Sequence, residues 1–161
     1  MKVKTLLIIT VCFLVWSACE FSAGKKKDFQ TGLSVSNAGF SIDQSYLVGP
    51  DNKIKTDNKV PINTTVAIVV EGIEHYEIKD GMAFPGLMLR VTDDEGNAVL
   101  DEQDLLVDYN GFSPADAAIL RGTVTAGSPM RSGETYHVTM RVWDKNKVEN
   151  EIVAEVDIDV L

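Results

Sequence analysis

The fold is decided by the segments YHVTMRVW (136–143) and IVAEVDIDV (152–160), which a turn at Lys145-Asn146-Lys147 joins. In the first segment every second residue from Tyr136 is apolar, and in the second every second residue from Ile152 is apolar. A period of two is the repeat of a β-strand with one buried and one solvated face. The two segments therefore predict an antiparallel hairpin that packs one face into a core and leaves Trp143 on the other face.

The chain repeats this alternation after residue 32, with turn residues between the apolar runs and no long helical period. One short helical turn is expected at Ser113-Pro114, an N-cap residue followed by proline. The other expected strands are 33–35, 40–48, 65–71, 87–92, 98–100 and 119–125. About seven to eight strands are typical of one antiparallel, all-β sandwich.

Composition limits the classes of protein to which the chain can belong. It has 15 basic and 24 acidic residues and a net charge of −9, whereas a nucleic-acid-binding protein needs a basic face to displace phosphate counterions. Two cysteines are too few for a disulfide-dense scaffold or a four-cysteine zinc site. An apolar fraction of 45% is too high for a disordered acidic tail. The composition is therefore that of an acidic protein with one folded domain.

The first 18 residues have the pattern of an export signal. Lys2 and Lys4 precede an uncharged, mostly apolar run of 14 residues (5–18), whereas a membrane-spanning helix needs about 20. The run leads into Trp16-Ser17-Ala18-Cys19, which resembles the lipobox of bacterial lipoproteins, with Trp16 where that family has an aliphatic residue. The resemblance implies that Cys19 becomes the first mature residue and carries fatty acids such as palmitate. It also implies a lipid-anchored protein of the bacterial cell envelope, at the outer membrane in a Gram-negative cell.

Cleavage before Cys19 would leave 13 basic and 24 acidic residues, a net charge of −11, and would remove Cys12, so that no intramolecular disulfide remains. Residues 19–32 are expected to form a flexible tether because they are polar, and the 13 residues after Cys19 would span about 20 Å. Lys25-Lys26-Lys27 in this tether would contact anionic lipid or simply be solvated, and both interpretations stay open. The folded domain is expected over residues 33–161.

The corner Gly133-Glu134-Thr135-Tyr136 resembles the late strands of immunoglobulin-like and fibronectin-like domains. In those domains a tyrosine at this corner forms a hydrogen bond back to the backbone. The resemblance therefore implies an immunoglobulin-like sandwich with Tyr136 in that role; the alternative is that Tyr136 only fills a core edge. The disulfide and the core tryptophan of the family are absent, because Trp143 is expected to point outward.

No enzyme motif is found in the chain. There is no nucleophile elbow and no phosphate-binding loop, and neither His75 nor His137 has a second histidine or cysteine at the spacing of a zinc site. The cluster from Asp93 to Asn97 fails the calcium-loop spacing and is interpreted as a hairpin turn. A looser calcium or metal candidate consists of Asp101, Asp104 and Asp108, with Glu102 beside them.

Three connections fall at one end of the sandwich if the strands alternate in direction: 72–85, 101–114 and 144–150. The first two are long, and long ordered loops are commonly functional. The aromatic and imidazole side chains expected at this end are His75, Tyr76, Phe84, Tyr109, Phe112 and Trp143. They form the candidate partner-binding residues, and the alternative is that some, above all Phe84 and Phe112, pack under their own loops.

These observations lead to a non-catalytic envelope module whose β-sandwich binds or adheres to a protein or glycan partner. Two alternatives stay open. One is a structural subunit of an envelope assembly that pairs through a sheet edge. The other is a calcium- or metal-dependent module or hydrolase that uses Asp101, Asp104 and Asp108. No further cofactor and no nucleic-acid partner are expected.

Overall fold

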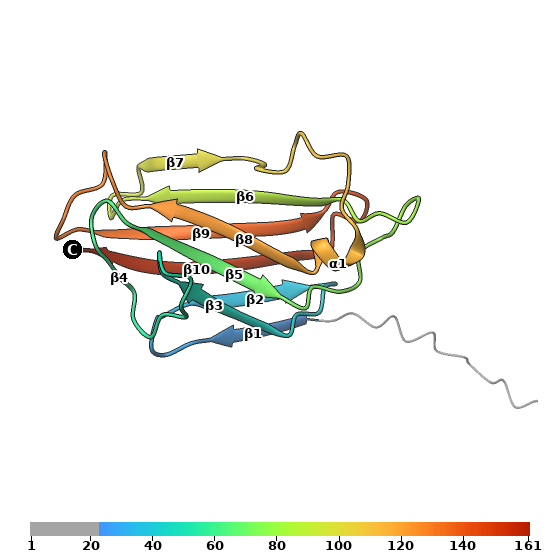
Figure 1. Ribbon diagram of the computed structural model, residues 1–161, viewed down its shortest axis with the longest axis horizontal. Coiled ribbons are helices and arrows are strands. Elements are labelled where there is room, and N and C mark those ends of the chain that lie inside the picture. Colours follow the sequence, from blue (N-terminus) through green and yellow to red (C-terminus); the bar gives the residue numbers. More distant parts are fainter. Residues whose placement is uncertain (1–22) are drawn as a thin grey trace, which may run out of the picture.

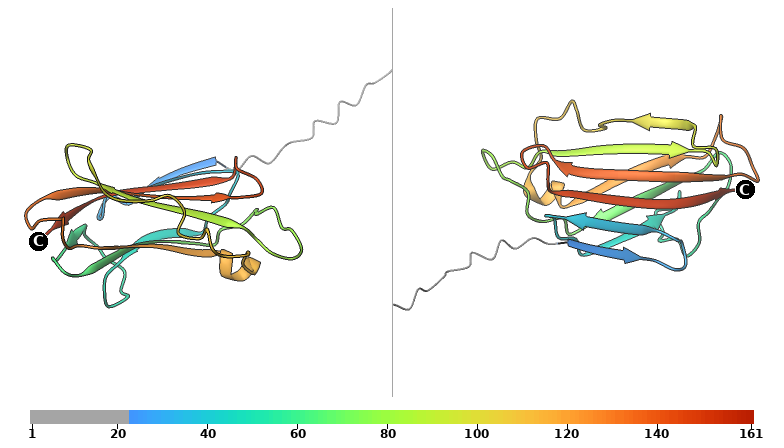
Figure 2. Two further views of the ribbon diagram at one scale, coloured as in Figure 1. Left: turned by 90° about the horizontal axis from the view of Figure 1, so that it is seen from above. Right: turned by 180° about the vertical axis from the view of Figure 1, so that it is seen from behind.

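The computed structural model describes residues 23–161, which form two β-sheets packed face to face (Figures 1 and 2). The expected export signal at 1–18 and the expected lipid site at Cys19 lie outside the described residues. Within residues 23–161 almost all regular structure is β, and the one α-helix there is α1 (Pro114–Ala117). Its N-cap is Ser113, whose hydroxyl accepts a hydrogen bond from the Asp116 amide, as the sequence predicts. Among residues 23–161, no helix is long and apolar enough to cross a membrane.

The larger sheet has the strand order β1-β2-β10-β9-β6-β7. Neighbours along this order are antiparallel, and a seventh, two-residue strand, β4, runs parallel to the end of β10. The strands are β1 (Ala23–Lys27), β2 (Ser34–Ala38), β4 (Lys59–Val60), β6 (Pro85–Thr92), β7 (Ala98–Glu102), β9 (Thr135–Asp144) and β10 (Glu151–Val160). The smaller sheet has the order β3-β5-β8, with β3 (Gln44–Val48), β5 (Thr65–Glu71) and β8 (Ile119–Thr125).

This arrangement confirms the expected immunoglobulin-like sandwich. One sheet places β6, β9 and β10 side by side with β7 at the edge, and the other places β3, β5 and β8 side by side, which is the division of strands in that fold. The described part of the chain forms ten strands rather than the expected seven to eight, because β1 and β4 are added. The strand expected at 33–35 corresponds to β2, which continues to Ala38 in the larger sheet. The strand expected at 40–48 is shorter in the structure: it is β3, which pairs with β5 in the smaller sheet.

The predicted flexible tether is wrong for residues 23–32. Residues 23–27 form β1, which pairs with β2 in the register Ala23↔Ala38 to Lys27↔Ser34, and Asp28 closes the turn by accepting the Thr31 hydroxyl at 2.6 Å. All five residues of β1 are exposed, so no apolar alternation marks this strand in the sequence. Its three lysines lie on a sheet edge, where charge discourages pairing with another chain.

The core is built from the side chains that the alternation placed inward. Val138, Met140 and Val142 of β9 pair with Val156, Ala154 and Ile152 of β10, and all six side chains are buried. Burying each of the valine, methionine and isoleucine side chains contributes about 1.5–3 kcal/mol relative to leaving it exposed.

The expected tyrosine corner is present. The Arg131 amide donates to the Tyr136 hydroxyl at 2.9 Å, and this hydroxyl donates to Glu134 at 2.6 Å. Burial and the hydrogen bond to Glu134 raise the pKa of Tyr136 above its ordinary value. Tyr136 therefore joins the core to the loop that precedes β9.

Candidate functional site

The three connections predicted to share one end of the sandwich do so, and we call this end the loop pole (Figures 1 and 2). It consists of residues 72–84 between β5 and β6, 103–113 between β7 and α1, and 145–150 between β9 and β10. The loops are joined to one another through hydrogen bonds rather than lying separately. The amide groups of Ala83 and Phe112 each donate to the other residue's carbonyl, at 2.9 and 2.8 Å.

Two fully buried polar side chains hold the first and third loops together. The Asp144 carboxylate accepts the amides of Glu77 at 2.6 Å and Asn146 at 2.9 Å. The Asn150 side chain donates to the His75 carbonyl at 2.7 Å. A buried carboxylate is costly unless its hydrogen bonds are made, so these contacts fix the loops in one arrangement.

A half-buried ion pair holds the second loop against the third. Lys145 Nζ lies 2.7 Å from Asp104 Oδ2 and donates to the Leu106 carbonyl at 2.9 Å. Asp104 Oδ1 also accepts the amides of Leu87 and Leu106. Burial alone would raise the pKa of Asp104, but the bonds from Lys145 and the two amides outweigh it and hold the pKa below its ordinary value.

These contacts give Asp104 a structural role. Within residues 23–161, no three acidic, histidine or cysteine side chains gather as a metal-ligand group. The structure therefore does not bring Asp101, Asp104 and Asp108 together as a metal site.

The aromatic residues singled out from the sequence divide between core and surface. Tyr76 packs against the Phe40 ring, with a centroid distance of 4.7 Å, and donates to the Ala117 carbonyl. Burial is the main cause that raises the pKa of Tyr76, followed by the charge of Asp144. Phe84 is half-buried beneath Gly111, where an added Cβ would meet its ring at 3.0 Å. Tyr76 and Phe84 are therefore part of the scaffold of the loop pole rather than of its surface.

Tyr109 and Phe112 form a stacked aromatic pair at the loop pole, in which Tyr109 is exposed and Phe112 is half-buried. Their rings stack with a centroid distance of 5.2 Å, and Tyr109 is 58% exposed. His75 is exposed and adopts a φ of 77°, and its carbonyl is the acceptor of Asn150. Trp143 lies on the outer face of the larger sheet, over Gly86 and beneath the Arg141 guanidinium at 5.2 Å. It is a neighbour of the loop pole rather than a member of it.

Sequence reasoning missed the aliphatic part of this surface. Val107 is 69% exposed and Val148 is 66% exposed, and both are in loops of the pole. Ile78 and Leu105 are exposed there as well. The available signal was the apolar run Leu105-Leu106-Val107 inside an otherwise polar loop, which the search for aromatic residues passed over.

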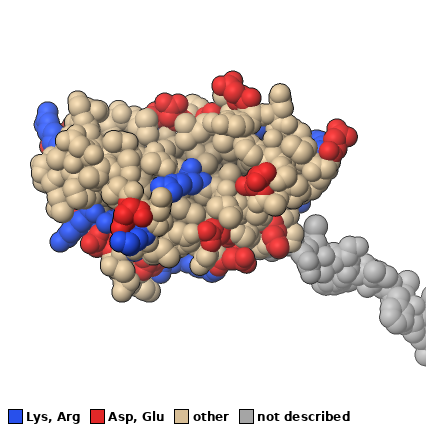
Figure 3. All heavy atoms as spheres, viewed as in Figure 1, with Lys and Arg blue, Asp and Glu red and all other residues tan. Residues whose placement is uncertain are grey.

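A second candidate surface is a groove of about 600 Å³ on the outer face of the smaller sheet. Val48 and Val69 form its floor, and Glu71 and Arg121 are the charged residues that line it; acidic and basic side chains are scattered over the same face of the molecule (Figure 3). Tyr46 donates a short hydrogen bond to Glu71, and this bond lowers the pKa of the Glu71 carboxyl. On the other side of the groove, Arg121 donates to Asn52 at 2.9 Å. The groove thus combines an apolar floor with hydrogen-bonding groups on its rim, a combination common in ligand sites.

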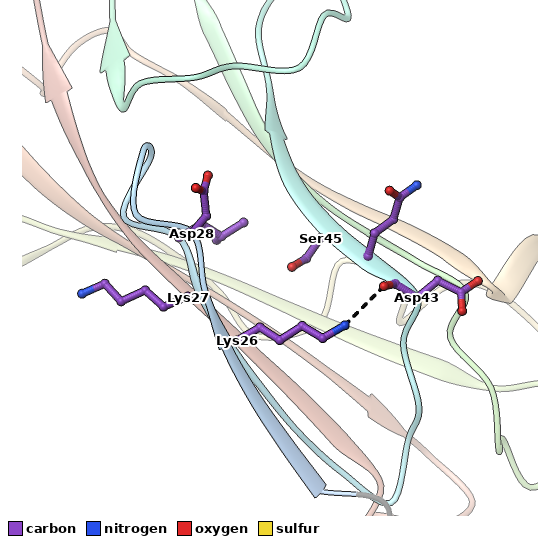
Figure 4. A pocket seen from close by; sticks show the side chains of 7 residues that line it. Lys26, Lys27, Asp28, Asp43 and Ser45 are labelled. Carbon is purple, nitrogen blue, oxygen red and sulfur yellow. Dashed lines mark hydrogen bonds between the residues drawn. The ribbon is translucent and has the colours of Figure 1, made fainter.

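A smaller cleft of about 250 Å³ separates β1 from β3, at the open side of the sandwich (Figure 4). Lys26 reaches across it and donates to the Asp43 carbonyl at 3.3 Å. Through this hydrogen bond Lys26, which the sequence placed in the tether, contacts the folded domain. The cleft has no aromatic lining, and we assign it no ligand.

Comparisons with known proteins assign the chain to no family. No family model matches the chain, and no curated protein matches it. Among solved structures, the chain is similar to the crystal structure of the C-terminal domain of wzt, with 8% identity and a TM-score of 0.49 over 89% of this chain and 79% of that one.

Proposed function

We propose that this protein is a non-catalytic binding module of the bacterial cell envelope, anchored by a lipid on Cys19, that recognises a protein partner with the loop pole. The anchor rests on the apolar run before Trp16-Ser17-Ala18-Cys19. The recognition surface consists of the exposed side chains of Val107, Tyr109 and Val148.

The observation that carries the proposal is the construction of the loop pole. Long loops ordinarily lose conformational entropy when they bind, which weakens affinity. Here Asp144, Asn150 and the pair Lys145–Asp104 already fix the loops before any partner arrives. Stiff loops that present a stacked aromatic pair and exposed aliphatic side chains favour recognition.

The test is a pull-down with the lipidated, full-length protein carrying Val107→Ser, Tyr109→Ala and Val148→Ser together. All three side chains are largely exposed, so we expect the melting temperature to stay within a few degrees of wild type and partner capture to be lost. The matched control is Phe29→Ala with Leu161→Ser, two exposed apolar side chains outside the loop pole. Equal capture by both variants would refute recognition through this surface.

A glycan is the alternative ligand, and the groove on the smaller sheet is the feature that favours it. Tyr46 offers a ring, and Arg121, Asn52 and Glu71 offer planar groups that donate and accept hydrogen bonds. An array of neutral glycans would test this ligand, with Arg121→Ala expected to abolish binding and the exposed Arg90→Ala on the other sheet expected to preserve it.

A structural role through a sheet edge is the second candidate function. Within residues 23–161, β8 pairs only with β5 and carries one charge, Arg121. The other edges are protected: β1 has three lysines, β7 has Asp101 and Glu102, and β3 is bridged to Ile54. An edge without such protection can pair with another strand. Thr123→Pro would block such pairing, and an unchanged assembly size in native membrane extracts would eliminate this candidate.

A further inference from the structure

The point at which the chain enters the domain limits which surface faces the membrane. β1 starts at Ala23, which pairs with Ala38, and Ala38 in turn pairs with Glu151, the first residue after the 145–150 loop. The chain therefore enters at the loop pole, and β1 leads away from it (Figure 1).

The length of chain before Ala23 fixes how far this pole can stand from the lipid. Three residues, 20–22, separate Ala23 from Cys19. Whatever their conformation, four peptide units span at most about 14 Å. With a lipid on Cys19, an anchor that is part of the proposed function, the entry point of the loop pole lies next to the membrane surface. The opposite end of the sandwich would lie farther away by the length of the ten-residue strands β9 and β10, about 34 Å.

The charge of the loop pole argues against the lipid surface itself as the ligand. Its three loops carry six acidic and three basic side chains, a net charge of −3. Lys79 and Lys145 form ion pairs with acids of the same loops, Glu77 and Asp104. The exposed acids that remain include Asp108, next to Tyr109, and Glu149, next to Val148; Lys147 adjoins Val148 on its other side and is exposed as well. An acidic surface is repelled by anionic headgroups and attracted by a basic protein surface.

We infer that the loop pole is the membrane-proximal face of the anchored protein and docks on a basic extramembrane surface of a protein embedded in the same membrane. The exposed Val107, Tyr109 and Val148 would form the apolar centre of this contact, and Asp108 and Glu149 its acidic rim. The short link to Cys19 keeps the face and its partner at the same height above the bilayer, so the local concentration of the partner is high.

Photocrosslinking in cells tests this inference with the full chain. A benzoylphenylalanine photocrosslinker replaces Tyr109 in one variant and Phe29, which is 92% exposed in the β1–β2 turn, in the control. We expect the probe at position 109 to capture an integral membrane protein with a basic extramembrane surface, identified by mass spectrometry, and the probe at 29 to capture none. Asp108→Lys with Glu149→Lys should reduce the yield by about tenfold or more, since like charges at an interface are strongly unfavourable. Asp94→Lys with Glu95→Lys, at the opposite end, should leave it unchanged.

The possible failures are distinguishable. An intact-mass measurement that finds no acyl group on Cys19 would overturn the anchor in the proposed function and this inference with it. A lipidated protein that is captured only through position 29 would overturn the inference and leave the anchor standing. Crosslinks from position 109 to lipid alone would show that the bilayer is the occupant, and the protein partner proposed here would be wrong.

Discussion

The loops of the loop pole and the hairpin turns at the opposite end of the sandwich are closed by different kinds of hydrogen bond. At the opposite end the two hairpin turns are closed by their own residues: Asp28 accepts from Gln30 and Thr31, and Asp93 accepts the amides of Glu95 and Asn97. At the loop pole the closing bonds join residues far apart in the sequence, such as Asp144 with Glu77 and Asn150 with His75. The loops of the pole are therefore one unit, whereas the hairpin turns at 28–33 and 93–97 are each closed locally. The other loops of that end, 49–64 and 126–134, are joined to each other by the bond from the Asn63 amide to the Ala126 carbonyl.

Asp144→Ala should be the most damaging of the changes that test this difference. It leaves the amides of Glu77 and Asn146 without their acceptor in a buried site. We expect a loss of about 3 kcal/mol in the free energy of unfolding, measured by denaturant titration. Amide exchange should rise in both the 72–84 and the 145–150 loops. A rise confined to 145–150 would contradict the description of the loop pole as one unit.

Lys145→Met should have an intermediate and pH-dependent effect. Removing the ammonium group leaves the half-buried Asp104 with its two amide donors alone, and we expect a loss of about 1–2 kcal/mol at pH 7. Because the pKa of Asp104 is lowered in the folded protein, its contribution is present above the ordinary value of 3.8 and is lost as the pH falls below it. The stability difference between wild type and variant should therefore shrink below about pH 4. A difference that is constant from pH 7 to pH 3 would mean that the pair contributes nothing through its charge.

Asp93→Ala should have the smallest effect of the three. The amides of Glu95 and Asn97 lie at an exposed turn, where water replaces the lost carboxylate. We expect the free energy of unfolding to fall by about 1 kcal/mol or less. Amide exchange should change only within residues 93–97. Any change in exchange at the 28–33 turn would show that turns at this end are coupled after all.

The same contrast explains how much of the structure could be predicted from the sequence. The alternation from Tyr136 to Val142 and from Ile152 to Val160 depends on neighbours along one strand, so the hairpin and its buried face were correctly predicted. The turn at Asp93 and the helix at Ser113 depend on bonds over two to four residues and were equally predictable.

The site could be predicted only in part. That three loops meet at one end follows from counting strands, but which side chains join them depends on contacts over 39 to 75 residues. Tyr76 was therefore taken for a surface residue, although it packs on Phe40 and donates to Ala117. β1 was missed for a related reason: its five exposed residues leave no periodic pattern, and only the register with β2 identifies it. Because β1 shortens the link to Cys19, this one strand determines which end of the domain lies near the membrane.

The most direct test of the account is the distance of each end of the domain from the membrane. Residues 23–161 contain no cysteine, so a fluorophore can be placed on Asn110→Cys at the loop pole or on Ser132→Cys at the opposite end while Cys19 carries the lipid. In native membranes containing a headgroup-labelled acceptor lipid, energy transfer should be strong from position 110. It should be much weaker from position 132, because the two ends are about 34 Å apart. Equal transfer from both positions, or stronger transfer from 132, would contradict the claim that the loop pole faces the membrane.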